Sequence, residues 1–319
     1  MAPNMRTLNV SVAALSAVAL WGLAFPLIQK GLEFASPIML GFVRFGFASL
    51  ALGVVLLAAF PAAEIKRVAV AEWKALSVLA ALYVTIPNIA QNIGLQNGTS
   101  SVACVIQSSG PVLTLMFAVA LLGESFTRRK VVGTIIAIGG TIALVTNGGI
   151  SLENEGFVSN AFILASAVSY GLAWVSAKRV LQRNPPLLVI GLAVMIGTGF
   201  LGLSVPLEQG LRLEVTGLAL LDFAVLGVFC AGLSSVLYLT ALRDEEVSRL
   251  AFFIYLMPVF ASLFAWLIRG EMVEAVTIAC AFVIVVGIAI ATREKSSRSG
   301  GGGPIPSGAG PSQTTPAKK

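Results

Sequence analysis

Histidine is absent from the 319-residue sequence, and cysteine occurs only three times. The missing imidazole removes the side chain that most often acts as an acid or base near neutral pH and most often binds metals. Cys104, Cys230 and Cys280 each lie alone inside an apolar run, which is typical of buried small side chains rather than of a disulfide framework. We therefore expect no metal and no cofactor.

Charge is also scarce, since charged residues make up 11% of the chain and hydrophobic residues 57%. The mean hydropathy is +0.91. A soluble domain of this length needs more polar surface than that. In hydrocarbon every backbone amide must be paired within the protein, so the choice is between helices and a closed barrel, and long continuous apolar runs favour helices. The sequence predicts an all-α integral membrane protein.

Windows of about 20 apolar residues predict ten transmembrane helices. They lie at residues 8–32, 37–60, 73–95, 99–122, 129–147, 158–181, 187–206, 217–242, 247–268 and 272–292. The first continues from Trp21 to Leu32 with no small-residue cleavage pattern, so a signal peptide is the weaker interpretation. Residues 293–319 form a Gly-, Ser- and Pro-rich tail that we expect to be disordered.

The net charge of +6 follows this topology. If the amino terminus is cytoplasmic, 17 of the 21 basic residues lie in cytoplasmic segments. The opposite face keeps only Lys30, Arg212 and Arg269, and Arg44 lies inside the second span. Both termini are therefore predicted to be cytoplasmic, in an inner or plasma membrane. The basic segments indicate contact with lipid rather than with nucleic acid.

The chain is internally duplicated. PVLTLMFAVALLGE, from Pro111 to Glu124, recurs as PVFASLFAWLIRGE, from Pro258 to Glu271, 147 residues later (258 minus 111). An earlier pair, at 21–22 and 170–171, repeats with an offset of 149 (170 minus 21). Five helices per half is an odd number, so the second half enters the membrane from the opposite side. We expect an inverted 5+5 repeat made of residues 1–147 and 158–292, with a connection at 148–157 and a cytoplasmic tail at 293–319.

The Trp-Gly pair at 21–22, the Phe-Pro pair at 25–26, Arg44 and the doubled motif ending in Gly-Glu resemble the EamA domains of the drug/metabolite transporter superfamily. The resemblance covers about residues 8–292. It implies transport of a small metabolite, often export, without ATP hydrolysis by the chain. It also implies a central cavity surrounded by the first four helices of each half, with the fifth peripheral. The halves differ, because Tyr170 replaces Trp21 and Ala193 stands where Arg44 would recur.

Arg44 is the only basic side chain well inside a predicted span, about seven residues, or ~10 Å of helix, from its outer end. A cation at that depth is costly, so we expect it to face a cavity or an anionic group of a solute. Snorkelling to the outer interface is the alternative.

The third span carries a polar stripe, and the 147-residue offset pairs Asn88 with Ser235 and Gln91 with Tyr238. Matched polar positions indicate a shared cavity, and hydrogen bonds between helices are the alternative. The amides predicted to line the cavity are Asn88, Gln91, Asn92 and Gln107. Aromatic residues inside spans suit a pocket for a partly apolar solute, with packed or lipid-facing rings as the alternative. They are Trp21, Tyr83, Tyr170, Trp174, Tyr238 and Tyr255.

Two matched pairs have structural or gating interpretations. Pro111 and Pro258 each remove a helical hydrogen bond, which favours bending between access states. Glu124 and Glu271 precede helix starts and lie near cations, which favours capping and gating over contact with a solute.

Acidic side chains are missing from the middle of every predicted span, and Asp222 lies near an outer end. This disfavours proton or sodium coupling and export of cations. The catalytic groups that an intramembrane enzyme needs are missing. No phosphate-binding Gly-Lys loop occurs, which disfavours transport driven by ATP hydrolysis in this chain. No ring of charged residues typical of a channel is visible. We expect a transporter, not an enzyme, that moves a small polar solute, best an amino acid or related compound and in the export direction. Efflux of drug-like compounds is the alternative, and monomer and dimer both stay open.

Overall fold

The computed structural model describes residues 5–97, 106–107, 109–125, 127–146, 157–269 and 275–292. Regular structure within these residues is helical, apart from an isolated antiparallel bridge between Ala35 and Leu213. Residues 148–156 of the predicted connection at 148–157, and the predicted tail at 293–319, lie outside the described residues.

Among the described residues, six helical segments are long and apolar enough to cross a membrane. They are Val10–Phe34, Pro37–Ala59, Trp73–Gln96, Val158–Leu181, Pro186–Leu207 and Gly217–Asp244. Shorter apolar helices occur at Gly110–Leu122, Val247–Ala261 and Ile278–Ile290. The all-α class is confirmed, and a multi-pass membrane protein follows from these segments. The count of ten membrane helices stays a prediction.

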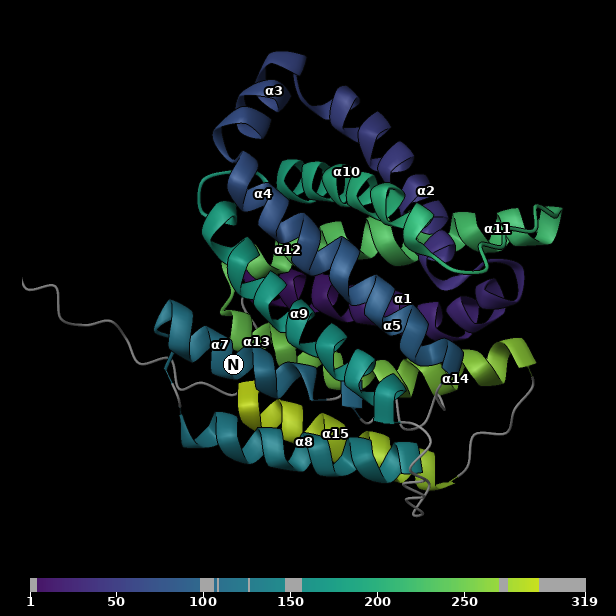
Figure 1. The fold of residues 1–319 in the computed structure, drawn as a ribbon. Coiled ribbons are helices and arrows are strands. Elements are labelled where there is room, and N and C mark those ends of the chain that lie inside the picture. The colour runs from purple at the N-terminus through teal and green to yellow at the C-terminus, as the bar shows by residue number, and fades with distance from the viewer. Residues whose placement is uncertain are drawn as a thin grey trace, which may run out of the picture.

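Figure 1 shows the order and arrangement of the helices. Up to residue 146 they are α1 (Met5–Phe34), α2 (Pro37–Ala59), α3 (Ala62–Ala71), α4 (Trp73–Ala80), η1 (Ala81–Thr85), α5 (Ile86–Asn97), α7 (Gly110–Leu122) and α8 (Arg128–Thr146). Beyond it they are α9 (Phe157–Leu181), α10 (Pro186–Ser204), η3 (Val205–Leu207), α11 (Gly217–Val225), η4 (Leu226–Leu233), α12 (Ser234–Asp244), α13 (Val247–Ala251), η5 (Phe252–Leu256), α14 (Met257–Arg269) and α15 (Ala275–Thr292).

Two of the long helices contain a π-helical segment. One is η1, between α4 and α5, and the other is η4, between α11 and α12. The 147-residue offset maps residues 81–85 onto 228–232, which lie inside η4. π-Helical segments are rare and frequently occur at functional sites. The duplication seen in the sequence therefore extends to an irregular backbone feature at matching positions.

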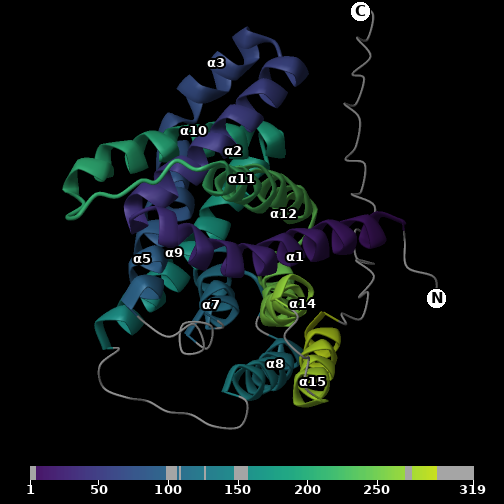
Figure 2. The same ribbon diagram turned by 90° about the vertical axis from the view of Figure 1, so that its right-hand side faces the viewer.

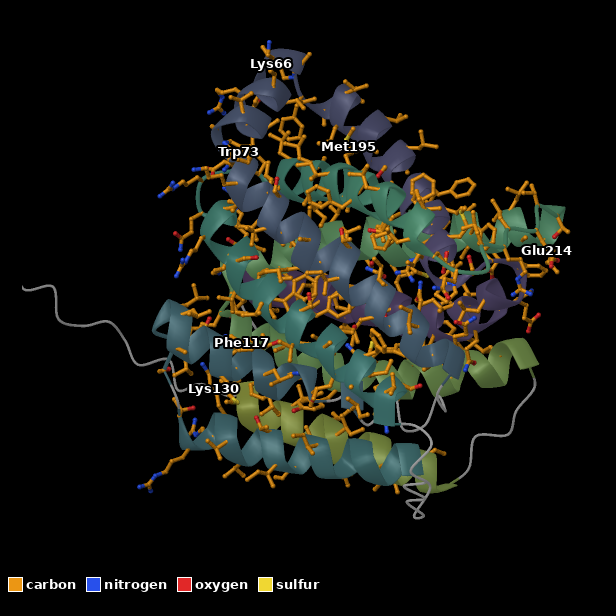
Figure 3. The ribbon with its side chains drawn as sticks, viewed as in Figure 1. Lys66, Trp73, Phe117, Lys130, Met195 and Glu214 are labelled. Atoms are coloured by element: carbon orange, nitrogen blue, oxygen red, sulfur yellow. The ribbon has the colours of Figure 1, made fainter. Side chains whose placement is uncertain are left out.

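The basic segment at residues 62–71, predicted only as part of a cytoplasmic connection, forms the helix α3. Glu64 in its first turn suits the positive end of the helix dipole. Val68 is buried, whereas Lys66 and Arg67 are exposed. Figure 3 places Lys66 at the tip of the molecule and Trp73 below it, at the start of α4.

The long helices pack in reciprocal pairs. α1 contacts α12 and α14, as α9 contacts α5 and α7. Figure 2 shows α1 between α12 and α14. α2 packs against η4 and α10, and α10 packs against η1 and α4. These helices surround the main core of the described residues.

α8 and α15 lie side by side at one edge of the molecule (Figures 1 and 2). A side-chain carbon built on Gly140 would lie 2.9 Å from Ile284 Cγ1, and one built on Gly287 would lie 2.7 Å from the backbone nitrogen of Ala137. Because 140 and 287, like 137 and 284, differ by 147, the two contacts are repeat equivalents. Neither position leaves room for a larger residue.

Candidate functional site

A cavity lies between α1, α2, η1, α5, α7, α9, η4, η5 and α14. None of its described lining residues comes from α8 or α15. The volume that the centre of a water molecule can occupy in the cavity is about 80 Å³. A single water requires roughly 10–15 Å³ by that measure, so the space corresponds to roughly five to eight waters.

Seven of the eleven residues predicted to bind a solute line this cavity. They are Trp21, Arg44, Tyr83, Gln91, Gln107, Tyr170 and Trp174. The tertiary structure brings them together from five different helical elements and from the short helical turn that holds Gln107.

Arg44 projects from α2 into the cavity and is 5% exposed. Its guanidinium carbon lies 5.0 Å from the centre of the Phe45 ring. Nε and Nη1 have no hydrogen-bond partner among the described residues. The side chain therefore does not snorkel. A buried cation in this setting strongly favours a carboxylate or another anion within reach.

The π-helical segment η4 holds the backbone of α2 at Arg44. A side-chain carbon built on Gly227 would lie 2.2 Å from the carbonyl oxygen of Arg44 and 2.6 Å from Phe47 Cβ. Only glycine allows this approach. The position of Arg44 in the cavity thus depends on Gly227.

Aromatic rings form one wall of the cavity, with Trp174 at its centre. The Trp174 ring lies 5.6 Å from that of Trp21, 5.0 Å from Tyr83, 6.3 Å from Tyr170 and 4.6 Å from Tyr238. Offset and tilted ring pairs at such distances attract one another. Tyr238 is fully buried behind Trp21 and Trp174 and does not line the cavity, contrary to the prediction.

Asn88 also lies outside the cavity lining, because it stabilises the π-helical backbone instead. Its Nδ2 donates to the carbonyl oxygens of Val84, at 2.7 Å, and Tyr83, at 3.3 Å. Pro87 lacks the N–H that would otherwise reach the Tyr83 carbonyl. Asn88 therefore compensates for a local break in the helix, which is one of the alternatives left open for polar residues in this span.

Asn92 and Tyr255 are likewise placed away from the cavity. Asn92 Nδ2 donates to the Pro37 carbonyl at 2.8 Å and ties α5 to the start of α2. Tyr255 packs with Ala137 and Ile284 against the α8–α15 pair. Both side chains serve contacts between helices in this structure.

The π-helical segment explains why Gln91, and not Asn88 or Asn92, faces the cavity together with Tyr83. In a regular α-helix, residues eight apart are rotated by roughly 80° from one another. An extra residue absorbed by the π-helical segment reduces this offset to roughly 20°. Tyr83 and Gln91 consequently share one face.

The two matched prolines occupy different places in their helices. Pro111 is in the first turn of α7, where the missing N–H removes no intrahelical hydrogen bond. Pro258 follows the 3₁₀-helix η5 directly, within a helical stretch that runs without a break from Val247 to Arg269. Bending at these prolines stays a prediction.

Glu124 caps a helix from the other half of the chain. Its carboxylate accepts the N–H groups of Val247, at 2.8 Å, and Ser248, at 3.1 Å, and also the Ser248 hydroxyl. The buried Lys130 lies 3.9 Å from Glu124 and donates to Glu246 at 2.7 Å. The predicted cap thus belongs to α13 rather than to α8. Glu271 lies outside the described residues.

A second carboxylate cap, not predicted from the sequence, lies at the opposite end of the molecule. Glu208 accepts the N–H groups of Ile38, at 2.7 Å, and Met39, at 3.0 Å, and the hydroxyl of Ser36, at 2.7 Å. It therefore caps α2. Each cap joins segments more than a hundred residues apart.

Several lining residues were missed in the sequence, although the repeat offers a signal for them. Cys230 lies 147 positions after Tyr83, Ile254 after Gln107 and Met257 after Gly110, and all of these line the cavity. Phe25 lies 149 before Trp174. Extending the repeat from polar to apolar partners would have found them.

The sequence matches the family model described as "EamA-like transporter family" over residues 9–146 and 158–293. A protein of Archaeoglobus fulgidus named "Uncharacterized transporter" is 26% identical, over 85% of this chain and 94% of its own. The "S-adenosylmethionine/S-adenosylhomocysteine transporter" of Chlamydia muridarum is 27% identical, over 79% and 81%. The "Probable terminal-alkyne amino-acid exporter" of Streptantibioticus cattleyicolor is 26% identical, over 80% and 84%.

One solved crystal structure superposes with a TM-score of 0.73 at 19% sequence identity, over 89% of this chain and 96% of the other. That likeness shows the fold. The names of the relatives are those of transporters and not of enzymes. Because the family model matches both halves of the sequence, this chain belongs to the EamA-like transporter family, as a multi-pass membrane transporter of small metabolites.

Proposed function

We propose that this protein exports a small zwitterionic or anionic metabolite, an amino acid or a related compound, by alternating access and without hydrolysing ATP. The observation that carries the proposal is Arg44, a buried cation in the cavity whose Nε and Nη1 have no partner among the described residues. A solute carboxylate would offer a hydrogen-bond acceptor to this cation, since charge-assisted hydrogen bonds between guanidinium and carboxylate groups are strong.

The rest of the cavity complements the other parts of an amino acid. Gln107 Oε1 is buried and has no hydrogen-bond partner among the described residues, so it is available to an ammonium group. Trp21, Tyr170 and Trp174 offer apolar ring surface to a side chain. A zwitterion requires a cation for its carboxylate and a hydrogen-bond acceptor for its ammonium group, and Arg44 and Gln107 provide these two groups.

The size of the cavity supports a small solute. Roughly five to eight waters occupy roughly 150–240 Å³ of liquid, which is the scale of an amino acid. We take the class of solute and the direction by analogy with the relative from Streptantibioticus cattleyicolor, which is named "Probable terminal-alkyne amino-acid exporter".

Reciprocal contacts between the halves support the inverted repeat of five plus five helices. A side-chain carbon built on Gly22 would lie 3.0 Å from the backbone nitrogen of Ala261, and one built on Gly171 would lie 3.2 Å from Thr114 Oγ1. Gly171 follows Gly22 by 149 residues, and Ala261 follows Thr114 by 147. Each close approach joins a helix of one repeat to a helix of the other. Such a pseudo-symmetric pair suits rocking about a central site.

We place both termini in the cytoplasm, in an inner or plasma membrane. Figure 3 shows Trp73 and Lys130 toward one end of the helices and Glu214 toward the other. The first end carries the Glu124 cap with Lys130 beside it, and the second carries the Glu208 cap. The caps are then gates on opposite faces.

Efflux of cationic drug-like compounds is a weaker candidate. None of the described lining residues is a carboxylate, and Arg44 would repel a cation. A neutral aromatic compound would leave Arg44 unpaired, which is costly.

Counterflow in proteoliposomes tests the proposal, with labelled L-amino acids, nucleosides and organic cations as the solutes. We expect exchange of amino acids, lost in Arg44→Leu and partly kept in Arg44→Lys. Losing a charge-assisted hydrogen bond of about 1.5–3 kcal/mol lowers affinity by about tenfold to a hundredfold. Arg67→Leu, a change of an exposed arginine, is the control and should behave like wild type.

Two outcomes would contradict the proposal. One is exchange of organic cations but not of amino acids by the wild type. The other is unchanged amino-acid exchange by an Arg44→Leu protein that inserts into the membrane normally.

A further inference from the structure

The one acidic side chain that the structure buries within a long apolar segment is Asp222, counted over the described residues. Thr216 caps α11 by accepting the N–H of Ala219 at 3.1 Å. The helix then buries Ala219, Asp222 and Phe223 and leaves Leu218 and Leu221 exposed. Asp222 therefore faces the protein and the leucines face lipid.

Asp222 lies directly against α1. It is 5% exposed, and its Oδ2 has no hydrogen-bond partner among the described residues. A side-chain carbon built on Gly31 would lie 3.2 Å from Oδ2 and 2.8 Å from Leu40 Cδ1. An ionised carboxylate with one oxygen buried and without a hydrogen bond is costly in such a site, and protonation lowers that cost.

The charged and titratable groups near Asp222 do not form an ion pair with it among the described residues. α11 packs against α1, α2 and η4. Lys30 and Glu33 on α1 act on Asp222 with opposite signs, and Cys230 on η4 is within electrostatic reach. Arg44 is the only charged residue of α2.

We propose that Asp222 is a proton-binding site, protonated while α1 packs against α11 and ionised when the two helices separate and water enters. The inference rests on the proposed alternating access, because that motion supplies the separation. A packed state that favours the protonated form and an open state that favours the ionised form are thermodynamically linked. One proton is then bound and released in each cycle.

The same helices connect Asp222 to the cavity. Ile28, one turn before Gly31 in α1, lines the cavity, and so does Cys230 in η4, which continues directly from α11. A shift of α1 that changes the cavity also changes the contact with Asp222. The carboxyl group is thus placed to couple proton binding to movement of the solute.

Infrared spectroscopy of the purified protein in lipid vesicles tests proton binding without any solute. Asp222→Asn keeps the shape of the side chain and removes its titration. Glu33→Gln, which changes an exposed carboxylate near the same end of α1, is the matched control. We expect a protonated-carboxyl band that persists to a higher pH than the bands of exposed carboxyl groups in the wild type and in Glu33→Gln, and that is absent from Asp222→Asn. Identical bands in all three proteins, or no such band in the wild type, would overturn the proposal.

Gly31→Ala provides a second variant that retains the carboxyl group. The added carbon would press α1 away from Oδ2 and Leu40 and admit water, so the band should disappear at a lower pH than in the wild type. An unchanged titration in Gly31→Ala would contradict the packing argument, even if Asp222→Asn were to insert poorly.

Transport measures the coupling itself, with the L-amino acid that gives counterflow. A pH gradient of one unit should drive up to about tenfold accumulation in one polarity for one proton per solute. Asp222→Asn should lose this accumulation and keep counterflow, and Glu33→Gln should keep both. A wild type indifferent to the gradient, or an Asp222→Asn variant that still responds, would overturn coupling. Absence of amino-acid counterflow in the wild type would instead count against the proposed function, since the infrared result does not depend on it.

Discussion

The hydroxyl groups of Tyr83 and Ser235 share a hydrogen bond that joins the two π-helical regions. Tyr83 lies in η1, and Ser235 lies two residues after η4. Ser235 is also the repeat equivalent of Asn88, which donates to the Tyr83 carbonyl. Ser235 and Asn88 therefore both hold Tyr83 in place. Ser235 bonds to its hydroxyl group, and Asn88 bonds to its backbone carbonyl.

Tyr83→Phe should lower stability while leaving the ring contacts with Tyr170 and Trp174 in place. The buried hydrogen bond contributes about 0.5–1.5 kcal/mol. Ser235→Ala removes the other hydroxyl, and the double variant completes a thermodynamic cycle. We expect the losses of unfolding free energy in the two single variants, added together, to exceed the loss in the double variant. Strict additivity would show that the bond contributes nothing.

Trp174→Ala should destabilise the protein by about 3–5 kcal/mol, because it leaves a void among four aromatic rings. Trp174→Phe retains part of the packing and should lose less stability. Thermal unfolding in detergent measures both. Since Trp174 also lines the cavity, Trp174→Phe should still weaken solute binding in counterflow. Equal stability of Trp174→Ala and the wild type would refute the role of the ring cluster.

Gly227→Ala should separate α2 from η4, because the added carbon would lie 2.2 Å from the Arg44 carbonyl oxygen. Overpacking of this kind costs about 1–3 kcal/mol. Gly53→Ala in α2 is the matched control, since a carbon built there meets nothing within 4 Å. The control should be neutral or more stable, as alanine favours helices. Similar melting temperatures for Gly227→Ala and the wild type would argue against the close contact.

Glu124→Ala should weaken the contact between α7 and α13, because three hydrogen bonds from Val247 and Ser248 lose their acceptor. We expect the cavity to open more often on that face, which labelling of Cys230 by a thiol reagent can report. The background is Cys104→Ala with Cys280→Ala, which leaves one thiol. Glu64→Ala, at a site in α3 distant from the cap, is the control. Labelling no faster than in the background protein would remove Glu124 from the gate.

Much of the cavity lining could be predicted from the sequence, because charged and amide side chains are rare in membrane-spanning helices. Arg44 and Gln91 stand out against apolar surroundings, and the repeat drew attention to Trp21 and Tyr170. The same reasoning placed Asn88 and Asn92 in the cavity, where they do not lie, because it assumed a regular helix. A π-helical segment changes which residues share a helix face, and no local sequence pattern predicted that segment.

Helical class, membrane location and the duplicated plan followed from the chain alone, because a backbone in hydrocarbon must satisfy its hydrogen bonds locally and the apolar runs are long enough to do so. Which face of each helix meets the cavity, a neighbouring helix or lipid depended on packing. Lipid and protein core are both apolar, so hydrophobic periodicity does not separate them. Contacts between distant segments therefore turned Tyr238 and Tyr255 away from the cavity and buried Asp222 against Gly31.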